Sequence, residues 1–224
     1  HFTPEVRELD PATFVERYLV DMLGVREIVV GYDHGFGKDR SGNLDTVQRL
    51  GTQFGFDVVR EPPTIQEGGP VSSTRIRSCV TAGDFEGARR LLGGGYPVSG
   101  RVVSGDGRGR QLGFPTANVL SDEPGKLMPP EGVYAAWAFV PQRHLAVVNL
   151  GNRPTFNGQS VSLEAHLIDF DGDLYDRNVI IEFEQRIRGE RRFEGPQALM
   201  DQIQRDCSDA RTFLSKQEST LLRR

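Results

Sequence analysis

The chain has 224 residues, with 27 lysines and arginines, 31 aspartates and glutamates, and a formal net charge of −4. That length allows one large domain or two small ones, each able to bury a core. The acidic balance argues against a nucleic-acid partner, and no run of about 18 apolar residues indicates a membrane span. Cys79 and Cys207 lie in no metal-ligand or C-x-x-C pattern, so a reduced, cytoplasmic setting is expected.

The first part of the chain follows an α/β pattern. Asp10 precedes a proline and a stretch of helical period, which predicts a helix over 11–23. Short apolar runs at 25–30 and 56–60 read as buried strands, and the spacing between them predicts a helix over 44–54. Alternating helices and strands predict a parallel sheet.

Two segments of this part are candidate anion sites. The loop 31–40 follows a strand and carries glycines with Lys38 and Arg40, where open α/β sheets bind ligands. The segment 71–77 begins a helix with hydroxyl residues, and its free N–H groups with Arg77 favour an anion. An ordinary capped helix is the alternative for the second segment.

The run G-G-G-Y-P at 93–97 breaks the composition and predicts a domain boundary, with domains at 1–95 and 96–224. Beyond it the period becomes that of strands, which predicts a small antiparallel barrel. The predicted strands are 98–103, 132–140, 144–150, 161–168 and 178–186. A final helix from about residue 196 packs on this barrel or forms an oligomer face; the oligomeric state cannot be read.

The stretch 100–118 carries the strongest chemical pattern. Its glycines alternate with charged residues, so backbone N–H groups and guanidinium groups can approach a phosphate; a solvated hairpin tip is the alternative. Thr116 and Asn118 are two apart in an extended segment, so both oxygens face one side, as a magnesium site requires. Glu164 likewise shares a strand face with Ser162 and His166, although such carboxylates are more often merely solvated.

These residues belong to a longer resemblance. The run R-V-V-S-G-D-G-R-G-R-Q-L-G-F-P-T-A-N at 101–118 resembles the riboflavin kinase signature. Four further segments fit in order: G-V-Y-A at 132–135, N-L-G-N-R-P-T-F at 149–156, E-A-H-L-I-D-F-D-G-D-L-Y at 164–175 and R-I-R-G-E-R-R-F at 186–193. The chain is similar to the bacterial bifunctional riboflavin kinase/FMN adenylyltransferases, also called FAD synthetases.

The resemblance implies a partial Rossmann-like nucleotidyltransferase domain followed by a Greek-key β-barrel with a C-terminal helix. It implies transfer of the γ-phosphoryl group of Mg-ATP to the riboflavin 5′-hydroxyl, giving FMN, with Glu164 as catalytic base. Thr116 and Asn118 are implied as magnesium ligands and Arg188 as a flavin-binding residue. The implied ATP-binding residues are Gly105, Gly107, Gly109, Arg110, Pro115, Thr116, Asn118, Phe170 and Tyr175.

The resemblance also covers the adenylyltransferase, which converts FMN to FAD with release of pyrophosphate. The family's first motif, with its H-x-G-H pair, has no counterpart in this sequence, so we expect FAD synthesis from an intact family member rather than from this chain alone. His34 stands where the family has an aromatic residue, which bears on how a nucleotide packs at that position. In the kinase part, Asp176 stands where glycine is usual, so a different turn is expected at Asp176. The implied adenylyltransferase residues are Asp33, Phe36, Gly37, Arg40, Ser72, Ser73, Thr74 and Arg77.

Two other functions remain open. A flavin- or nucleotide-binding module without turnover would bind the same small molecules but release no ADP. A nucleic-acid-binding barrel would use the arginine loops and show steep salt dependence, which the acidic balance disfavours.

Overall fold

The computed structural model describes residues 1, 3–32, 35–123, 125–155 and 158–221. The chain packs into two compact units, His1–Val71 and Ser72–Arg224, and each is described by itself. None of the helices in the described ranges is long and apolar enough to span a membrane.

The first unit contains a two-stranded parallel sheet and the helices that pack with it. Asp10 caps the N-terminus of a helix and Pro11 occupies its first turn, as the sequence predicts. Strands β1 and β2 pair in parallel, with Val29 opposite Val59. The elements are α1 (Pro4–Arg7), α2 (Pro11–Phe14), a π-helix (Val15–Met22), β1 (Glu27–Gly31), a 3-10 helix (Lys38–Arg40), α3 (Leu44–Phe54), β2 (Asp57–Glu61) and the ribbon β3 (Ile65–Gln66) and β4 (Gly69–Pro70).

The second unit begins with a helix pair. Ser72 caps α4 (Ser73–Ala82) and Asp84 caps α5 (Phe85–Leu92) through their side-chain oxygens. Both helices end at glycines in the left-handed conformation, which relieves the strain that a larger residue would carry there. Gly83 ends α4 and Asp84 caps α5, so these two residues form the turn between the helices.

A closed six-stranded antiparallel barrel follows, in the order β10-β5-β6-β9-β8-β7. Strands β7, β8 and β9 are consecutive neighbours and β10 returns to lie beside β7, which is the Greek-key arrangement. The strands are β5 (Tyr96–Val103), β6 (Ala117–Ser121), β7 (Gly132–Val140), β8 (Gln142–Thr155), β9 (Gly158–Leu167) and β10 (Asn178–Arg188). The prediction of five strands was wrong by one, because β6 has only five residues and directly follows the glycine-rich stretch.

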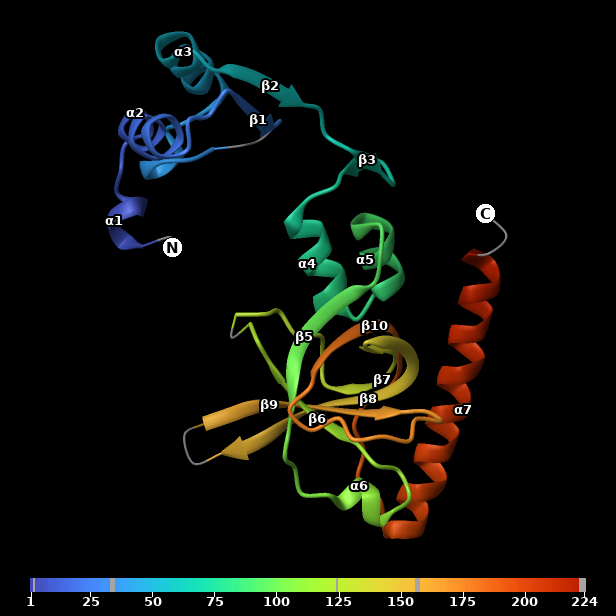
Figure 1. Cartoon of the computed structure of the whole chain (residues 1–224). Helices are drawn as coiled ribbons and strands as arrows, with labels where there is room; N and C mark the ends of the chain where they lie inside the picture. The colour runs from blue at the N-terminus through green and yellow to red at the C-terminus, as the bar shows by residue number, and fades with distance from the viewer. Residues whose placement is uncertain (2, 33–34, 124, 156–157, 222–224) are drawn as a thin grey trace. The chain divides into compact units, whose positions relative to one another are not determined.

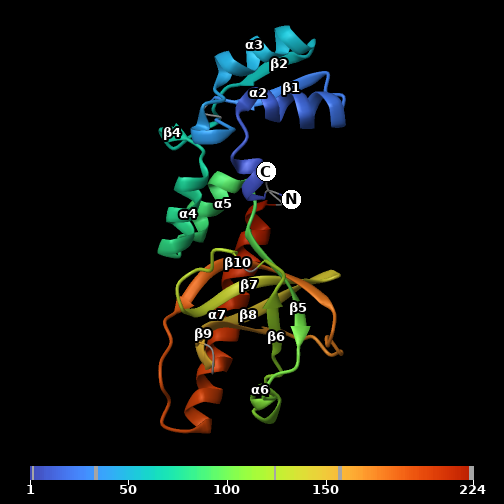
Figure 2. The same cartoon turned by 90° about the vertical axis from the view of Figure 1, so that its left-hand side faces the viewer.

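The C-terminal helix α7 (Pro196–Leu221) packs on the barrel. Figures 1 and 2 show it running along the side of the barrel, with α4 and α5 beyond one end and the short helix α6 (Arg108–Gln111) beyond the other. Ala210 and Leu214 are fully buried with Ala135 and Trp137 of β7. The predicted packing of this helix on the barrel is thus confirmed.

Helix α5 is part of the barrel's packing. Phe85 is only 4% exposed and belongs to the barrel core, where its ring stacks on Phe183 and meets Tyr134 edge-on. The packing therefore divides the chain between Val71 and Ser72, whereas the composition breaks at 93–97. The functional boundary between residues 95 and 96 stays a prediction.

Candidate functional site

Thr116 and Asn118 lie on the same face at the start of β6. Ala117 and Val119 alternate with them and point into the barrel core. Thr116 and Asn118 instead line one polar cavity outside that core. The alternation that the sequence predicts in this segment is confirmed.

Glu164 lies in the middle of a row of side chains that crosses neighbouring strands. In the strand register, Glu164 of β9 stands opposite Asn118 of β6 on one side and Asn149 of β8 on the other. The Ser162 hydroxyl donates a hydrogen bond to the Glu164 carboxylate over 3.3 Å. Since Leu163 and Ala165 are buried in the core, Glu164 faces away from it, toward the polar cavity.

The glycines of the stretch 105–110 allow two close approaches. A methyl group at Gly105 would overlap the side-chain amide of Asn118, and one at Gly109 would overlap the carbonyl oxygen of Phe114. The loop therefore lies directly against the residues that precede and begin β6. Part of this stretch forms α6, a single turn that the sequence analysis did not predict.

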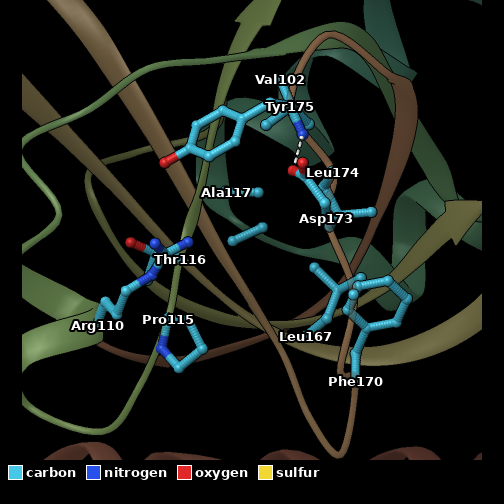
Figure 3. Close-up of a pocket in the computed structure, with 12 residues that line it drawn as sticks. Val102, Arg110, Pro115, Thr116, Ala117, Leu167, Phe170, Asp173, Leu174 and Tyr175 are labelled. Carbon is cyan, nitrogen blue, oxygen red and sulfur yellow. Dashed lines mark hydrogen bonds between the residues drawn. The ribbon is translucent and has the colours of Figure 1, made fainter.

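Three cavities adjoin these residues, and the first, which we call the small cavity, has a volume of about 70 Å³. Figure 3 shows Arg110, Pro115 and Thr116 on one side of it and Phe170, Asp173 and Leu174 on the other. The backbone N–H of Tyr175 donates to the Asp173 carboxylate over 2.9 Å, which holds the segment after β9 in place. Five of the predicted ATP-binding residues line this cavity: Arg110, Pro115, Thr116, Phe170 and Tyr175.

The second, which we call the polar cavity, measures about 230 Å³. It is lined by Thr116, Asn118 and Glu164 together with the glycine loop. Its wall also includes Asn149, Gly151, Ser162 and Glu190, none of which was expected as a site residue. A methyl group at Gly151 would overlap the Glu190 carboxylate, so that glycine lets the side chain pack against β8.

The third, which we call the large cavity, measures about 710 Å³. Its wall includes Thr116, Asn149 and Glu164, Arg188 at the end of β10, Phe193 in the segment that follows, and Leu199, Ile203 and Asp206 of α7. Arg188 lies on this wall, and its guanidinium is paired with the Asp206 carboxylate, with Nη2 and Oδ2 2.7 Å apart; its role in flavin binding stays a prediction. Asp206 was not nominated because no local sequence pattern reveals which face of α7 meets β10.

The donor set of the polar cavity fits a hard divalent cation. Thr116 and Asn118 contribute uncharged oxygens, and Glu164 contributes a carboxylate on the same wall. Hard cations such as magnesium prefer oxygen ligands and keep several ligands from water or nucleotide phosphate. Within the described ranges no cluster of three or more His, Cys, Asp or Glu side chains could hold a metal ion. The candidate site consists of the Thr116 hydroxyl, the Asn118 amide oxygen and the single carboxylate of Glu164.

Asp176 adopts a backbone conformation that is typical of glycine. Its φ of 62° is in the left-handed region, which glycine adopts without strain, and a guanidinium nitrogen of Arg101 lies 3.3 Å from its carboxylate.

Burial, and secondarily the Asp206 charge, raises the pKa of the Cys207 thiol to about 11. The thiol is therefore protonated at neutral pH and is no nucleophile.

The predicted adenylyltransferase residues are divided between the two units. In the first, Phe36 bridges to Gly42, and Gly37 has a φ of 70° at the start of a 3-10 helix that includes Arg40. A methyl group at Gly37 would lie 2.9 Å from Cγ of Pro11. The predicted Asp33 and the unusual His34 lie outside the described residues.

In the second unit, the predicted hydroxyl residues begin α4. The Ser72 hydroxyl accepts a hydrogen bond from the backbone N–H of Arg75 over 3.3 Å, so it acts as the helix cap. Ser73, Thr74 and Arg77 are exposed in the first turns. This geometry agrees with both readings of the segment, the anion site and the ordinary capped helix.

Family models match both parts of the chain. A model described as riboflavin kinase matches residues 92–214, and one described as FAD synthetase matches residues 1–75. The first covers the barrel and most of α7, together with the end of α5. The second covers the whole first unit and the start of α4.

Curated relatives match almost the whole chain. A protein of Pseudomonas fluorescens named bifunctional riboflavin kinase/FMN adenylyltransferase is 42% identical over 214 residues, which are 95% of this chain and 68% of the relative. One of the same name from Listeria monocytogenes is 36% identical over 97% of this chain and 69% of the relative. A crystal structure described as a macrolide-efflux protein from Streptococcus pneumoniae is 32% identical, with a TM-score of 0.79 over 94% of this chain and 67% of that one.

Proposed function

Because the chain belongs to the bifunctional riboflavin kinase/FMN adenylyltransferase family, we propose that its second unit transfers the γ-phosphoryl group of ATP to the 5′-hydroxyl of riboflavin. The products are FMN and ADP. One observation carries the assignment of the site: Thr116 lines all three cavities, and Glu164 lines both the polar and the large cavity. A phosphoryl group that passes from a nucleotide to an acceptor would pass Thr116 and Glu164, where the polar and large cavities share these lining residues.

The small cavity suits the base of the nucleotide. Phe170 and Tyr175 offer aromatic surface there, and Arg110 offers a guanidinium on the side next to Thr116. The glycine loop 105–109 borders the polar cavity, where its backbone can approach phosphate oxygens. The large cavity, with aromatic and aliphatic side chains on its wall, has room for the flavin ring system.

Glu164 is the proposed general base. A phosphoryl acceptor must be oriented and must give up its proton, and a carboxylate within hydrogen-bond reach performs both tasks. Ser162 orients the Glu164 carboxylate by a hydrogen bond, and the strand pairing with Asn118 and Asn149 fixes its position. The acceptor hydroxyl then attacks the γ-phosphorus while the bond to the ADP oxygen breaks.

Thr116 and Asn118 are the proposed ligands of magnesium. When bound with ATP, this ion neutralises charge on the phosphate oxygens. The arrangement that supports this role is the shared face of the two side chains at the start of β6.

The intact family member is expected to adenylylate FMN as well, giving FAD and pyrophosphate. The residues that we propose for this reaction in the intact protein are Asp33, Phe36, Gly37, Arg40, Ser72, Ser73, Thr74 and Arg77. The cytoplasm is the proposed location, which agrees with two free cysteines.

The deciding experiment incubates the protein with riboflavin and Mg-ATP and separates riboflavin, FMN and FAD by chromatography. We expect FMN to accumulate and Glu164→Gln to lower kcat by roughly 10²- to 10⁴-fold, the usual contribution of a general base. Thr116→Ala should raise the magnesium requirement. Glu182→Gln is the matched control, since Glu182 also lies on a barrel strand but lines none of the three cavities.

The same experiment tests the alternatives. If folded wild-type protein returns riboflavin unchanged while binding it, the kinase proposal is wrong and a binding module without turnover takes its place. Tight, steeply salt-dependent binding of RNA or DNA would instead favour the nucleic-acid barrel. The amount of FAD formed reports on adenylylation by this chain.

A further inference from the structure

Helix α7 brings one buried carboxylate to the wall of the large cavity. Asp206 is only 1% exposed. Nε of Arg188 lies 3.1 Å from each of its oxygens, and Nη2 lies 2.7 Å from Oδ2. Two donors on one carboxylate fix the plane of the guanidinium as well as its position.

A buried amide extends this pair to a second arginine. Nε2 of Gln202 donates to Oδ1 of Asp206 over 2.7 Å, and Oε1 of Gln202 accepts from Nη2 of Arg191. The guanidinium carbons of Arg188 and Arg191 lie 5.7 and 4.8 Å from the centre of the Phe193 ring. Two residues of α7 thus hold both arginines around an aromatic ring that lines the large cavity.

The pair is also connected to the proposed catalytic row. Arg188 stands opposite Val133 in the barrel, Val133 opposite Asn149, and Asn149 opposite Glu164. Gly132 allows the close approach of β10 at this point, because a methyl group there would lie 2.6 Å from the carbonyl oxygen of Arg188. The position of Arg188 is therefore set by the barrel on one side and by Asp206 on the other.

We infer that Asp206, assisted by Gln202, is a positioning residue for the phosphoryl acceptor: it holds Arg188 and Arg191 in the geometry that binds riboflavin in the large cavity. This inference rests on the proposed function. Stability alone is a weak explanation, since burying an ion pair costs as much desolvation as its attraction returns. The Asp206–Arg188 pair does fix a guanidinium on the wall of the large cavity, and this is what an orienting role requires.

The inference predicts a split between the two substrates. Asp206, Leu199 and Ile203 of α7 line the large cavity, but no residue of α7 lines the small cavity assigned to the nucleotide. Loss of the Asp206 charge should therefore weaken riboflavin binding and leave ATP binding unchanged. A merely structural role would affect both substrates.

The test measures kcat, KM for riboflavin and KM for ATP in Asp206→Asn, together with the Kd for riboflavin from its fluorescence. We expect the riboflavin KM and Kd to rise roughly tenfold or more, as for loss of a hydrogen bond to a charged group, and the ATP KM to stay within about twofold, as for residues that share no partner. Asp206→Asn combined with Arg188→Gln should weaken riboflavin binding by less than the sum of the two single losses, because Asp206 acts largely through Arg188. Additive losses would overturn the inference.

Glu218→Gln is the matched control. Glu218 is another carboxylate of α7 paired with a barrel arginine, Arg143, but it lines none of the three cavities. Its substitution should leave both KM values unchanged.

Should Asp206→Asn fail to fold, Gln202→Met keeps the Asp206–Arg188 pair and releases only Arg191, and it should raise the riboflavin KM alone. Equal changes in both KM values, or none, in an active protein overturn this inference only. A wild-type protein that forms no FMN overturns the proposed function instead.

Discussion

At Gly105 the backbone passes so close to Asn118 that even a methyl group would overlap the side-chain amide. The loop and the proposed magnesium ligand therefore depend on one another. Substitution at this glycine displaces Asn118 without removing any oxygen ligand. Comparison with a loop glycine that does not contact Asn118 therefore separates the effect on the magnesium requirement from the effect on the loop itself.

We predict that Gly105→Ala raises the magnesium concentration for half-maximal kinase rate roughly tenfold, the usual cost of disturbing the support of a metal ligand. Steady-state rates at several magnesium concentrations measure this. Gly107→Ala is the control: nothing lies within 4 Å of a methyl group there, although its φ of 67° strains the new residue. An unchanged magnesium requirement in Gly105→Ala would show that Asn118 is not a magnesium ligand.

Sequence alone predicts site residues where a strand imposes a period of two. Thr116 and Asn118 were nominated in this way, whereas the role of Glu164 came from the family resemblance, and the structure brings all three to one cavity. Gln202 and Asp206 could not be nominated, because they lie on a helix whose orientation depends on packing against β7, β8 and β10. Gln202 is 11 residues from its partner Arg191, and Asp206 is 18 residues from its partner Arg188. Neither spacing belongs to a known site motif.

Among the elements, β6 and α5 show why strand and domain prediction from sequence is incomplete. β6 is short, and the proline and glycines before it read as loop. Helix α5 was assigned to the first domain because the glycine run after it is the clearest break in the sequence. In the structure α5 packs with the second unit, because Arg89 of α5 pairs with the buried Glu184 of β10, which also accepts from Gln217 of α7 over 2.9 Å. The functional boundary between residues 95 and 96 stays a prediction.

We predict that Phe85→Ala destabilises the second unit by about 3–5 kcal/mol, the usual cost of removing a fully packed phenylalanine. Phe85 contacts Tyr134 and Phe183 in the barrel core, so its loss leaves a cavity there. Urea unfolding followed by fluorescence measures the free energy of unfolding. Leu92→Ala, a substitution of an exposed residue on the same helix, should cost far less; similar costs for both would show that α5 does not pack into the barrel as described.

At the scale of the whole chain, two units carry two sets of proposed residues. Every residue that we assign to the kinase reaction lies in the second unit, from the glycine loop to Arg188. The adenylyltransferase residues are divided, with Phe36, Gly37 and Arg40 in the first unit. The two activities should therefore respond differently when the first unit is removed.

We predict that a fragment of residues 72–224 keeps the kinase kcat and both KM values within about twofold, because its cavities and core are complete. A fragment of residues 96–224 lacks Phe85 and Arg89, so it should unfold at a lower urea concentration. Its kinase activity should be lower because less of the protein is folded. Flavin chromatography and urea unfolding on both fragments measure this. Equal stability of the two fragments would place the structural boundary at the glycine run, and loss of kinase activity from a folded 72–224 fragment would show that the first unit takes part in the kinase reaction.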